Sequence, residues 1–143
     1  MLSISKSVRR FLLPSFVLTS GLLYAAGGVD KITGVGEVMA GGAKARFNFN
    51  ASNPSNPKGH LHFEDEGTGL RLRSTDITAY VGVGAVQRRI EGTGVLDDGT
   101  TVTWVVNAFD DEAGGGDQFA IAVSNGYADN GFLLKGDIRI HAP

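Results

Sequence analysis

The chain has no cysteine among its 143 residues, and this absence removes several kinds of chemistry. Disulfide bonds, thiolate metal sites and cysteine nucleophiles are all excluded. Proline is scarce, with four residues, whereas glycine is abundant, with 21. A fold without disulfides depends on its hydrophobic core, and this chain is long enough to bury one.

Helical patterning and catalytic motifs are missing as well. No stretch of ten or more residues shows the periodicity of an amphipathic helix. There is no Gly-x-Ser-x-Gly elbow, and glycine pairs such as Gly34-Val35-Gly36 do not precede a helix, which argues against a dinucleotide site. We therefore expect a non-enzymatic protein that carries no cofactor, calcium aside.

One long apolar run without charge stands near the N-terminus. Residues 11–26 follow the basic residues Lys6, Arg9 and Arg10, and Ala25-Ala26-Gly27 places small residues before a cleavage point. This is the pattern of a secretory signal peptide. The run is shorter than the roughly 20 residues that span a membrane, and an uncleaved anchoring helix is the alternative. We predict a signal peptide over 1–27, a single domain over 28–143, and a secreted, extracellular or periplasmic location.

Cleavage would change the charge balance. Removing the three basic residues of 1–27 leaves ten basic against fifteen acidic residues, a net charge of −5. An acidic domain is a poor general ligand for nucleic acid or for an anionic membrane. We expect neither nucleic acid nor, after cleavage, a membrane as the partner, and instead an unidentified extracellular or cell-surface partner.

Alternation with a period of two residues dominates 28–143. In 43–51 the apolar side chains share one face and Lys44, Arg46, Asn48 and Asn50 share the other, which is typical of a half-buried strand. Similar patterns predict strands at 32–39, 43–51, 59–65, 70–73, 77–86, 88–96, 101–109, 119–123 and 132–141. The predicted fold is all-β, a single antiparallel barrel or sandwich of about eight to nine short strands. A barrel is favoured because it leaves no exposed sheet edge.

Eight short stretches extend through almost the whole of 28–143. They include Gly-His-Leu-His-Phe-Glu-Asp at 59–65 and Gly-Asp-Ile-Arg-Ile at 136–140, and the others lie at 30–36, 45–49, 67–75, 90–94, 117–121 and 124–127. The ordered set resembles the post-COAP domain family. The resemblance implies a small, glycine-rich, extracellular bacterial β-domain, often a C-terminal module, with no established catalytic residues.

An acidic segment surrounds the triple glycine at 114–116. Its carboxylates belong to Asp110, Asp111, Glu112 and Asp117. Oxygen ligands on a flexible loop suit calcium, although the spacing is not that of an EF-hand. These four residues are the predicted calcium site, and the alternative is a solvated acidic loop.

Two further clusters have candidate chemistry. His60 and His62 share a strand face with Glu64, a usable spacing for metal ligands, and the alternative is a polar outer face. Arginines gather at Arg71, Arg73, Arg88 and Arg89, and such a cluster could bind a carboxylate or a sulfated sugar. The alternative for the arginines is a set of surface ion pairs with Glu64 or Glu91.

Three functions are consistent with these patterns. The first is a non-enzymatic extracellular interaction or structural module, the second is a barrel that carries an apolar ligand in its interior, and the third is a barrel-based enzyme. The barrel interior separates the first two. No room for a ligand remains if the interior is filled by Phe47, Phe49, Phe63, Trp104 and Phe119.

Overall fold

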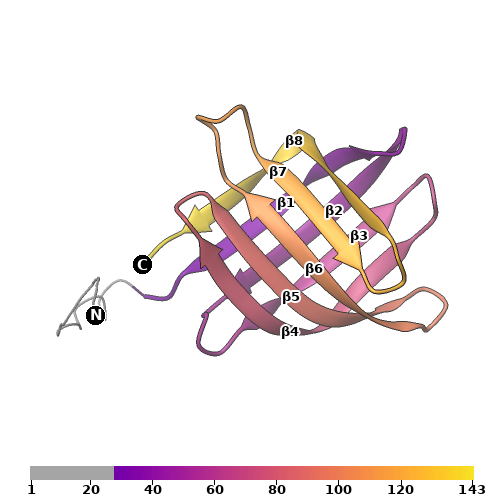
Figure 1. The fold of residues 1–143 in the computed structure, drawn as a ribbon, viewed down its shortest axis with the longest axis horizontal. Coiled ribbons are helices and arrows are strands. Elements are labelled where there is room, and N and C mark those ends of the chain that lie inside the picture. Colours follow the sequence, from indigo (N-terminus) through magenta and orange to yellow (C-terminus); the bar gives the residue numbers. More distant parts are fainter. Residues whose placement is uncertain (1–27) are drawn as a thin grey trace. The chain divides into compact units, whose positions relative to one another are not determined.

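Eight β-strands build the part of the chain that the structure describes. The computed structural model describes residues 28–143, and the predicted signal peptide over 1–27 lies outside the described residues. The strands are β1 Lys31–Ala40, β2 Ala43–Ser52, β3 Lys58–Asp65, β4 Arg71–Val83, β5 Gln87–Leu96, β6 Thr101–Phe109, β7 Gln118–Val123 and β8 Ala128–His141 (Figure 1).

Each strand pairs antiparallel with the next, and β8 pairs with β1, so the sheet closes on itself as a barrel. The prediction of an all-β antiparallel fold is confirmed, with the barrel as its form. Register follows the alternation of the sequence. Gly34 on β1, for example, stands opposite Phe49 on β2 and Ile138 on β8, and all three face the interior.

Two expected boundaries were wrong. The predicted strands at 70–73 and 77–86 form one strand, β4, because shifts of register between Ser74 and Asp76 and between Ile77 and Ala79 absorb the extra residues. The predicted strand at 132–141 also begins too late, because β8 starts at Ala128. Gly126, with a φ of 97°, completes the turn, and β8 begins at Ala128 because its first residues already pair with β7.

Aromatic side chains fill the interior of the barrel. Phe47, Phe49, Phe63, Trp104 and Phe119 are each no more than 3% exposed. The rings of Phe47 and Phe119 stack in parallel with centroids 4.1 Å apart, and the Phe63 ring lies 5.9 Å from that of Phe119. An eight-stranded barrel is just wide enough for its own side chains. The interior is thus a packed core.

Inward-facing glycines make room for these rings. A Cβ atom at Gly34 would lie 2.6 Å from Cζ of Phe49, and one at Gly92 would lie 2.5 Å from Cζ2 of Trp104. The Trp104 indole lies over the Gly92 backbone and donates a hydrogen bond of 3.0 Å to the carbonyl oxygen of Thr93. A Cβ atom at Gly94 would likewise lie 2.7 Å from the carbonyl oxygen of Arg73, so the glycines of β5 allow the neighbouring backbone to approach closely.

An ionic cluster occupies the end of the barrel where β1 and β5 begin. The guanidinium of Arg88, 7% exposed, donates through Nε and Nη2 to the two carboxylate oxygens of Asp30, at 2.9 and 2.8 Å. The Tyr80 hydroxyl donates to the same carboxylate. The hydrogen bond from Arg88 holds the pKa of Asp30 below its usual range against the effect of burial. Burial and the hydrogen bond to Asp30 raise the pKa of Tyr80.

A second polar cluster lies at the opposite end, where β3 ends and β8 begins. The Tyr127 hydroxyl donates a hydrogen bond of 2.6 Å to Oδ2 of Asp65, whose other oxygen accepts from the amides of Gly67 and Thr68. Burial opposes ionisation of Asp65, but these hydrogen bonds outweigh it and lower its pKa. Asp129 lies on β8 within this end, and its buried Oδ2 has no hydrogen-bond partner. Both ends of the barrel are therefore filled by side chains.

Candidate functional site

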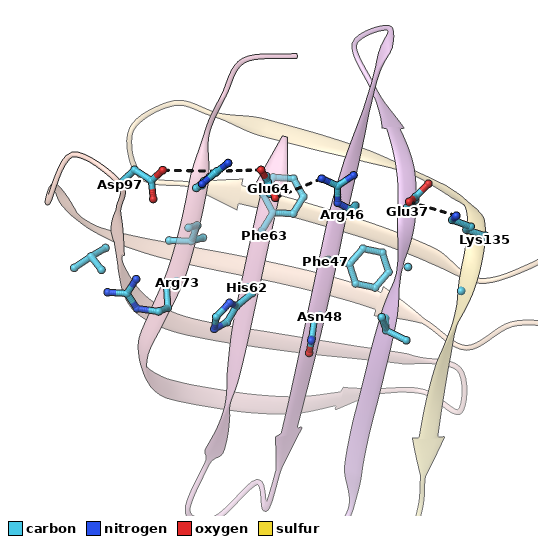
Figure 2. Close-up of a pocket in the computed structure, with 16 residues that line it drawn as sticks. Glu37, Arg46, Phe47, Asn48, His62, Phe63, Glu64, Arg73, Asp97 and Lys135 are labelled. Atoms are coloured by element: carbon cyan, nitrogen blue, oxygen red, sulfur yellow. Dashed lines mark hydrogen bonds and ion pairs between the residues drawn. The ribbon is translucent and has the colours of Figure 1, made fainter. Parts of the chain in front are cut away.

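A groove of about 560 Å³ crosses the outer face of the barrel over β1 to β5, with β8 at one side. Figure 2 shows its polar side chains on successive strands, with the rings of Phe47 and Phe63 also drawn among the residues that line it. The strands place them there because side chains alternate between the two faces of a sheet. Because the apolar residues of each strand point into the core, the polar residues between them point outward, and on neighbouring strands they line up in rows across the outer face.

Charges of alternating sign line one row of the groove. We call this row the charge ladder, and it consists of Lys135, Glu37, Arg46, Glu64, Arg71 and Asp97. Its ion pairs are 3.7 Å between Lys135 and Glu37, 3.6 Å between Arg46 and Glu64, 2.9 Å between Arg71 and Glu64, and 3.7 Å between Arg71 and Asp97. Exposed pairs of this kind contribute about 0–1 kcal/mol each. Each cation of the ladder has a carboxylate beside it.

Basic side chains that form no ion pair among the described residues occupy the rows next to the ladder. We call this surface the basic face, formed by Lys31, Lys58, His60, His62, Arg73 and His141. Arg73 stands directly opposite His62, and Lys31 and Lys58 stand on either side of Ser52. Within residues 28–143, Lys31, Lys58 and Arg73 form no ion pair.

The predicted arginine cluster is divided by the fold. Arg88 points into the barrel end, and Arg89 pairs with Glu91 at 2.8 Å. Arg71 belongs to the charge ladder. The surface ion pairs given as the alternative are therefore what Arg71 and Arg89 make. Arg73 alone of the four has no carboxylate partner among the described residues.

The predicted histidine row does not gather metal ligands. Nε2 of His60 lies 3.1 Å from Oδ1 of Asn48, and its Nδ1 lies 3.0 Å from Nδ2 of Asn50. Glu64 is engaged by arginines, and the His60 and His62 rings meet edge to face with centroids 5.8 Å apart. Across residues 28–143 there is no group of three or more His, Asp or Glu side chains arranged to hold a metal ion.

The acidic segment supports β8 through backbone hydrogen bonds. Oδ2 of Asp117 accepts from the amide of Ile138 at 2.8 Å, and Oδ2 of Asp110 accepts from the amide of Ile140 at 2.8 Å. These carboxylates occupy the side of β8 where the short strand β7 no longer reaches. Asp111 binds the amide of Gly114, and Glu112 is exposed. The calcium site over Asp110, Asp111, Glu112 and Asp117 stays a prediction.

Asp117→Ala is expected to lower the free energy of unfolding by about 2 kcal/mol, because two backbone amides, of Asp111 and Ile138, lose a charged acceptor. Urea unfolding measures the change. Glu112→Ala, at an exposed position of the same segment, is the control and should leave stability within about 0.5 kcal/mol of the wild type.

A melting experiment with added calcium distinguishes calcium binding by the acidic segment from its hydrogen bonding to β8. If calcium binds, it raises the melting temperature of the wild type, a chelator reverses the rise, and Asp117→Ala abolishes it. A melting temperature that is unchanged by calcium and by chelator would contradict the predicted calcium site, whereas the cost of Asp117→Ala would remain.

Asp129→Asn is expected to stabilise the barrel at neutral pH by about 1 kcal/mol, because it removes the charge of a partly buried carboxylate whose Oδ2 has no hydrogen-bond partner. Burial, followed by the charge of Asp65, raises the pKa of Asp129, although a backbone hydrogen bond from Asn130 opposes the shift. The folded barrel thus holds this proton more tightly than the unfolded chain. The resulting stability is full below the unfolded pKa of about 3.9 and is lost as pH rises through the folded pKa.

Unfolding in urea at neutral and at acidic pH measures this effect. The gain from Asp129→Asn should shrink as the pH falls, and Asp76→Asn, at an exposed aspartate, should show no gain at either pH. An equal gain in both variants would contradict the assignment of the effect to the buried oxygen.

Sequence reasoning missed the polar clusters at the barrel ends. The sequence did contain an indication of them, because Asp65 lies two residues after Phe63 and Arg88 two residues before Ile90. Both charged residues therefore occupy inward-facing positions of their strands. A charged residue in the apolar phase of a strand indicates a buried partner. Its identity, however, depends on pairing between distant parts of the chain.

Comparisons of the chain with protein-family models, with curated proteins and with solved structures gave no match. The resemblance to the post-COAP domain family accordingly stays a prediction. In the described part of the chain, no helix has the length and apolar character needed to cross a membrane.

Proposed function

We propose that this chain is an exported, non-enzymatic β-barrel that acts as an extracellular interaction module, and that it binds through the groove and the basic face. The observation that carries the proposal is the contrast between the two sides of the sheet. The inner side is filled by aromatic rings, and the outer side over β1 to β5 has a groove whose lining includes charged and amide side chains together with His62, Val35 and Val95.

The packed interior argues against the carrier of an apolar ligand. Such a carrier needs an enclosed apolar cavity of about 300 Å³ or more. Here Phe119 lies against both Phe47 and Phe63 in the middle of the barrel, and the polar clusters of Arg88 and of Asp65 fill the ends. A ligand therefore meets this protein on its outside.

The export part of the proposal rests on the pattern of residues 1–27. Intact-mass analysis of the full chain, expressed in a secreting host and recovered from the medium or envelope, tests it. A mass that corresponds to loss of the first 26 or 27 residues supports cleavage, and retention of Met1 in the recovered protein would contradict it.

A capture experiment tests the binding surface. The protein recovered from the host is immobilised and exposed to medium and envelope fractions, alongside two variants. His62→Ala/Arg73→Ala alters the proposed surface, and Arg89→Ala removes an exposed cation from β5, outside the groove and the basic face. We expect the wild type and Arg89→Ala to retain the same molecules and the double variant to lose them. Equal retention by all three would contradict the proposed surface.

A further inference from the structure

The outer face of β8, β1, β2, β3 and β4 places positive charge on an acidic protein. Residues 28–143 have a net charge of −5, yet the cations without ion pairs on this face are Lys31, Lys58 and Arg73. Asp137 on β8 shares a row with Val35, and it already accepts a bond of 3.2 Å from Arg139. A surface region with an excess of positive charge raises the local concentration of negatively charged ligands.

Amide and hydroxyl groups separate these cations. Thr33, Asn48, Asn50 and Ser52 face outward between them. His60 bridges Asn48 and Asn50, so that Nε2–H donates to one amide and Nδ1 accepts from the other. The bridge fixes the two amides and leaves Nδ2 of Asn48 and Oδ1 of Asn50 free for a ligand. A donor and an acceptor side by side suit the hydroxyl groups of a sugar.

The surface is long and open rather than deep. From β8 to β4 it crosses four strand spacings, roughly 19 Å at about 4.8 Å each. The groove continues it along the charge ladder. A surface of this length suits a polymer better than a small molecule.

We infer that the basic face binds a linear polysaccharide that carries carboxylate groups, with the guanidinium of Arg73 as the principal carboxylate contact. Arg73 fits this role because its planar fork matches a carboxylate and because it is the cation in the groove without a carboxylate beside it among the described residues. The inference rests on the proposed function and names the class of its partner.

A nucleic acid fits the face less well. Single strands are held by exposed aromatic rings on which bases stack, and the outward positions of the basic face carry no Phe, Tyr or Trp. Duplex DNA carries a phosphate charge about every 1.7 Å of its axis, a density that three spaced cations do not match.

Binding to four polymers tests the inference, by calorimetry or by retardation in affinity gels. The probes are polygalacturonate, the same polymer with its carboxylates methyl-esterified, dextran sulfate, and duplex DNA. We expect polygalacturonate to bind, the esterified polymer not to bind, and added salt to weaken the complex.

Three variants locate the contact. Arg73→Glu is expected to weaken polygalacturonate binding by about tenfold or more, since a charge-assisted bond is replaced by repulsion. Lys31→Ala/Lys58→Ala should weaken it less, and Arg89→Ala should leave it unchanged. Arg73 is exposed and makes no side-chain hydrogen bond within residues 28–143, so the melting temperature of Arg73→Glu should match that of the wild type.

The outcomes that overturn the inference are specific. They are absence of binding to polygalacturonate, equal binding of the esterified polymer, tighter binding of dextran sulfate or DNA, or an affinity that Arg73→Glu does not change. If polygalacturonate fails while the captured molecules are still lost from His62→Ala/Arg73→Ala, the polysaccharide inference falls and the proposed function stands. If polygalacturonate does not bind and His62→Ala/Arg73→Ala retains the same captured molecules as the wild type, both the polysaccharide inference and the proposed binding surface are contradicted.

Discussion

Phe119→Ala is expected to lower the free energy of unfolding by about 3–5 kcal/mol. Phe119 is 1% exposed, its ring stacks on that of Phe47 with centroids 4.1 Å apart, and it lies 5.9 Å from each of the rings of Phe49 and Phe63. Its removal takes away apolar burial and opens a cavity in the middle of the barrel. Closed strands on all sides resist collapse into that cavity, which favours the upper part of the range.

Phe132→Ala is the matched control, because it makes the same change at a phenylalanine on β8 that is 54% exposed. Its effect on unfolding in urea should stay within about 0.5 kcal/mol. A small apolar molecule such as benzene should raise the melting temperature of Phe119→Ala and not that of the wild type, since it can occupy the new cavity. Similar losses in both phenylalanine variants would contradict the packed interior.

Asp30→Ala is expected to cost about 3 kcal/mol, because it leaves the charge of Arg88 buried without its partner. The side chain of Arg88 is 7% exposed and that of Asp30 is 17% exposed, so the cost lies at the low end for buried pairs. The Tyr80 hydroxyl also loses its acceptor. Asp137→Ala, which breaks the exposed pair with Arg139, is the control and should cost about 0–1 kcal/mol.

The pair at the barrel end also predicts a dependence on pH. The pKa of Asp30 is lower in the folded barrel than in the unfolded chain, mainly through the hydrogen bond from Arg88. The stabilisation is therefore present above the unfolded pKa of about 3.9 and is lost as pH falls through the folded pKa. The stability difference between wild type and Asp30→Ala should shrink in acid. A difference that stays constant from neutral to acidic pH would contradict this role.

Much of the fold could be predicted from alternation alone. The apolar side chains of 43–51 identified the inward face of β2, and a barrel was favoured because it leaves no exposed sheet edge. Strand boundaries were harder to predict where a β-bulge interrupts the alternation of apolar and polar residues. The residues between Ser74 and Ala79 change phase at two bulges, so that one strand looked like two. A bulge is set by the pairing with β5, and a single strand does not reveal its partner.

The candidate site was predictable only in part. The sequence indicated that His60, His62 and Arg73 face outward, because they lie opposite to Leu61, Phe63 and Leu72 in the strand alternation. It did not indicate that Arg73 would lack a carboxylate while Arg71 has one. That difference depends on the register of β3 and β4, which places Glu64 opposite Arg71 and His62 opposite Arg73.

Contacts across the barrel escaped the sequence for a related reason. Asp30 and Arg88 are 58 residues apart, and Asp65 and Tyr127 are 62 apart. Closure of the ring brings each pair together. Propensity and alternation depend only on residues that are close in sequence, and they do not report which strands pair when the barrel closes. The sequence could therefore indicate a buried charge but not its partner.

The carboxylates of Asp110 and Asp117 take the place of a neighbouring strand beside the last residues of β8. Along its final residues β8 is bonded to backbone on one side, by β1, and to these two side chains on the other. A side chain can be removed by one substitution, whereas a strand cannot. A chain that lost both carboxylates would expose the amides of Ile138 and Ile140 as an open edge, the feature through which β-proteins join one another and aggregate. We therefore expect loss of both aspartates to favour association of barrels through the exposed edge of β8.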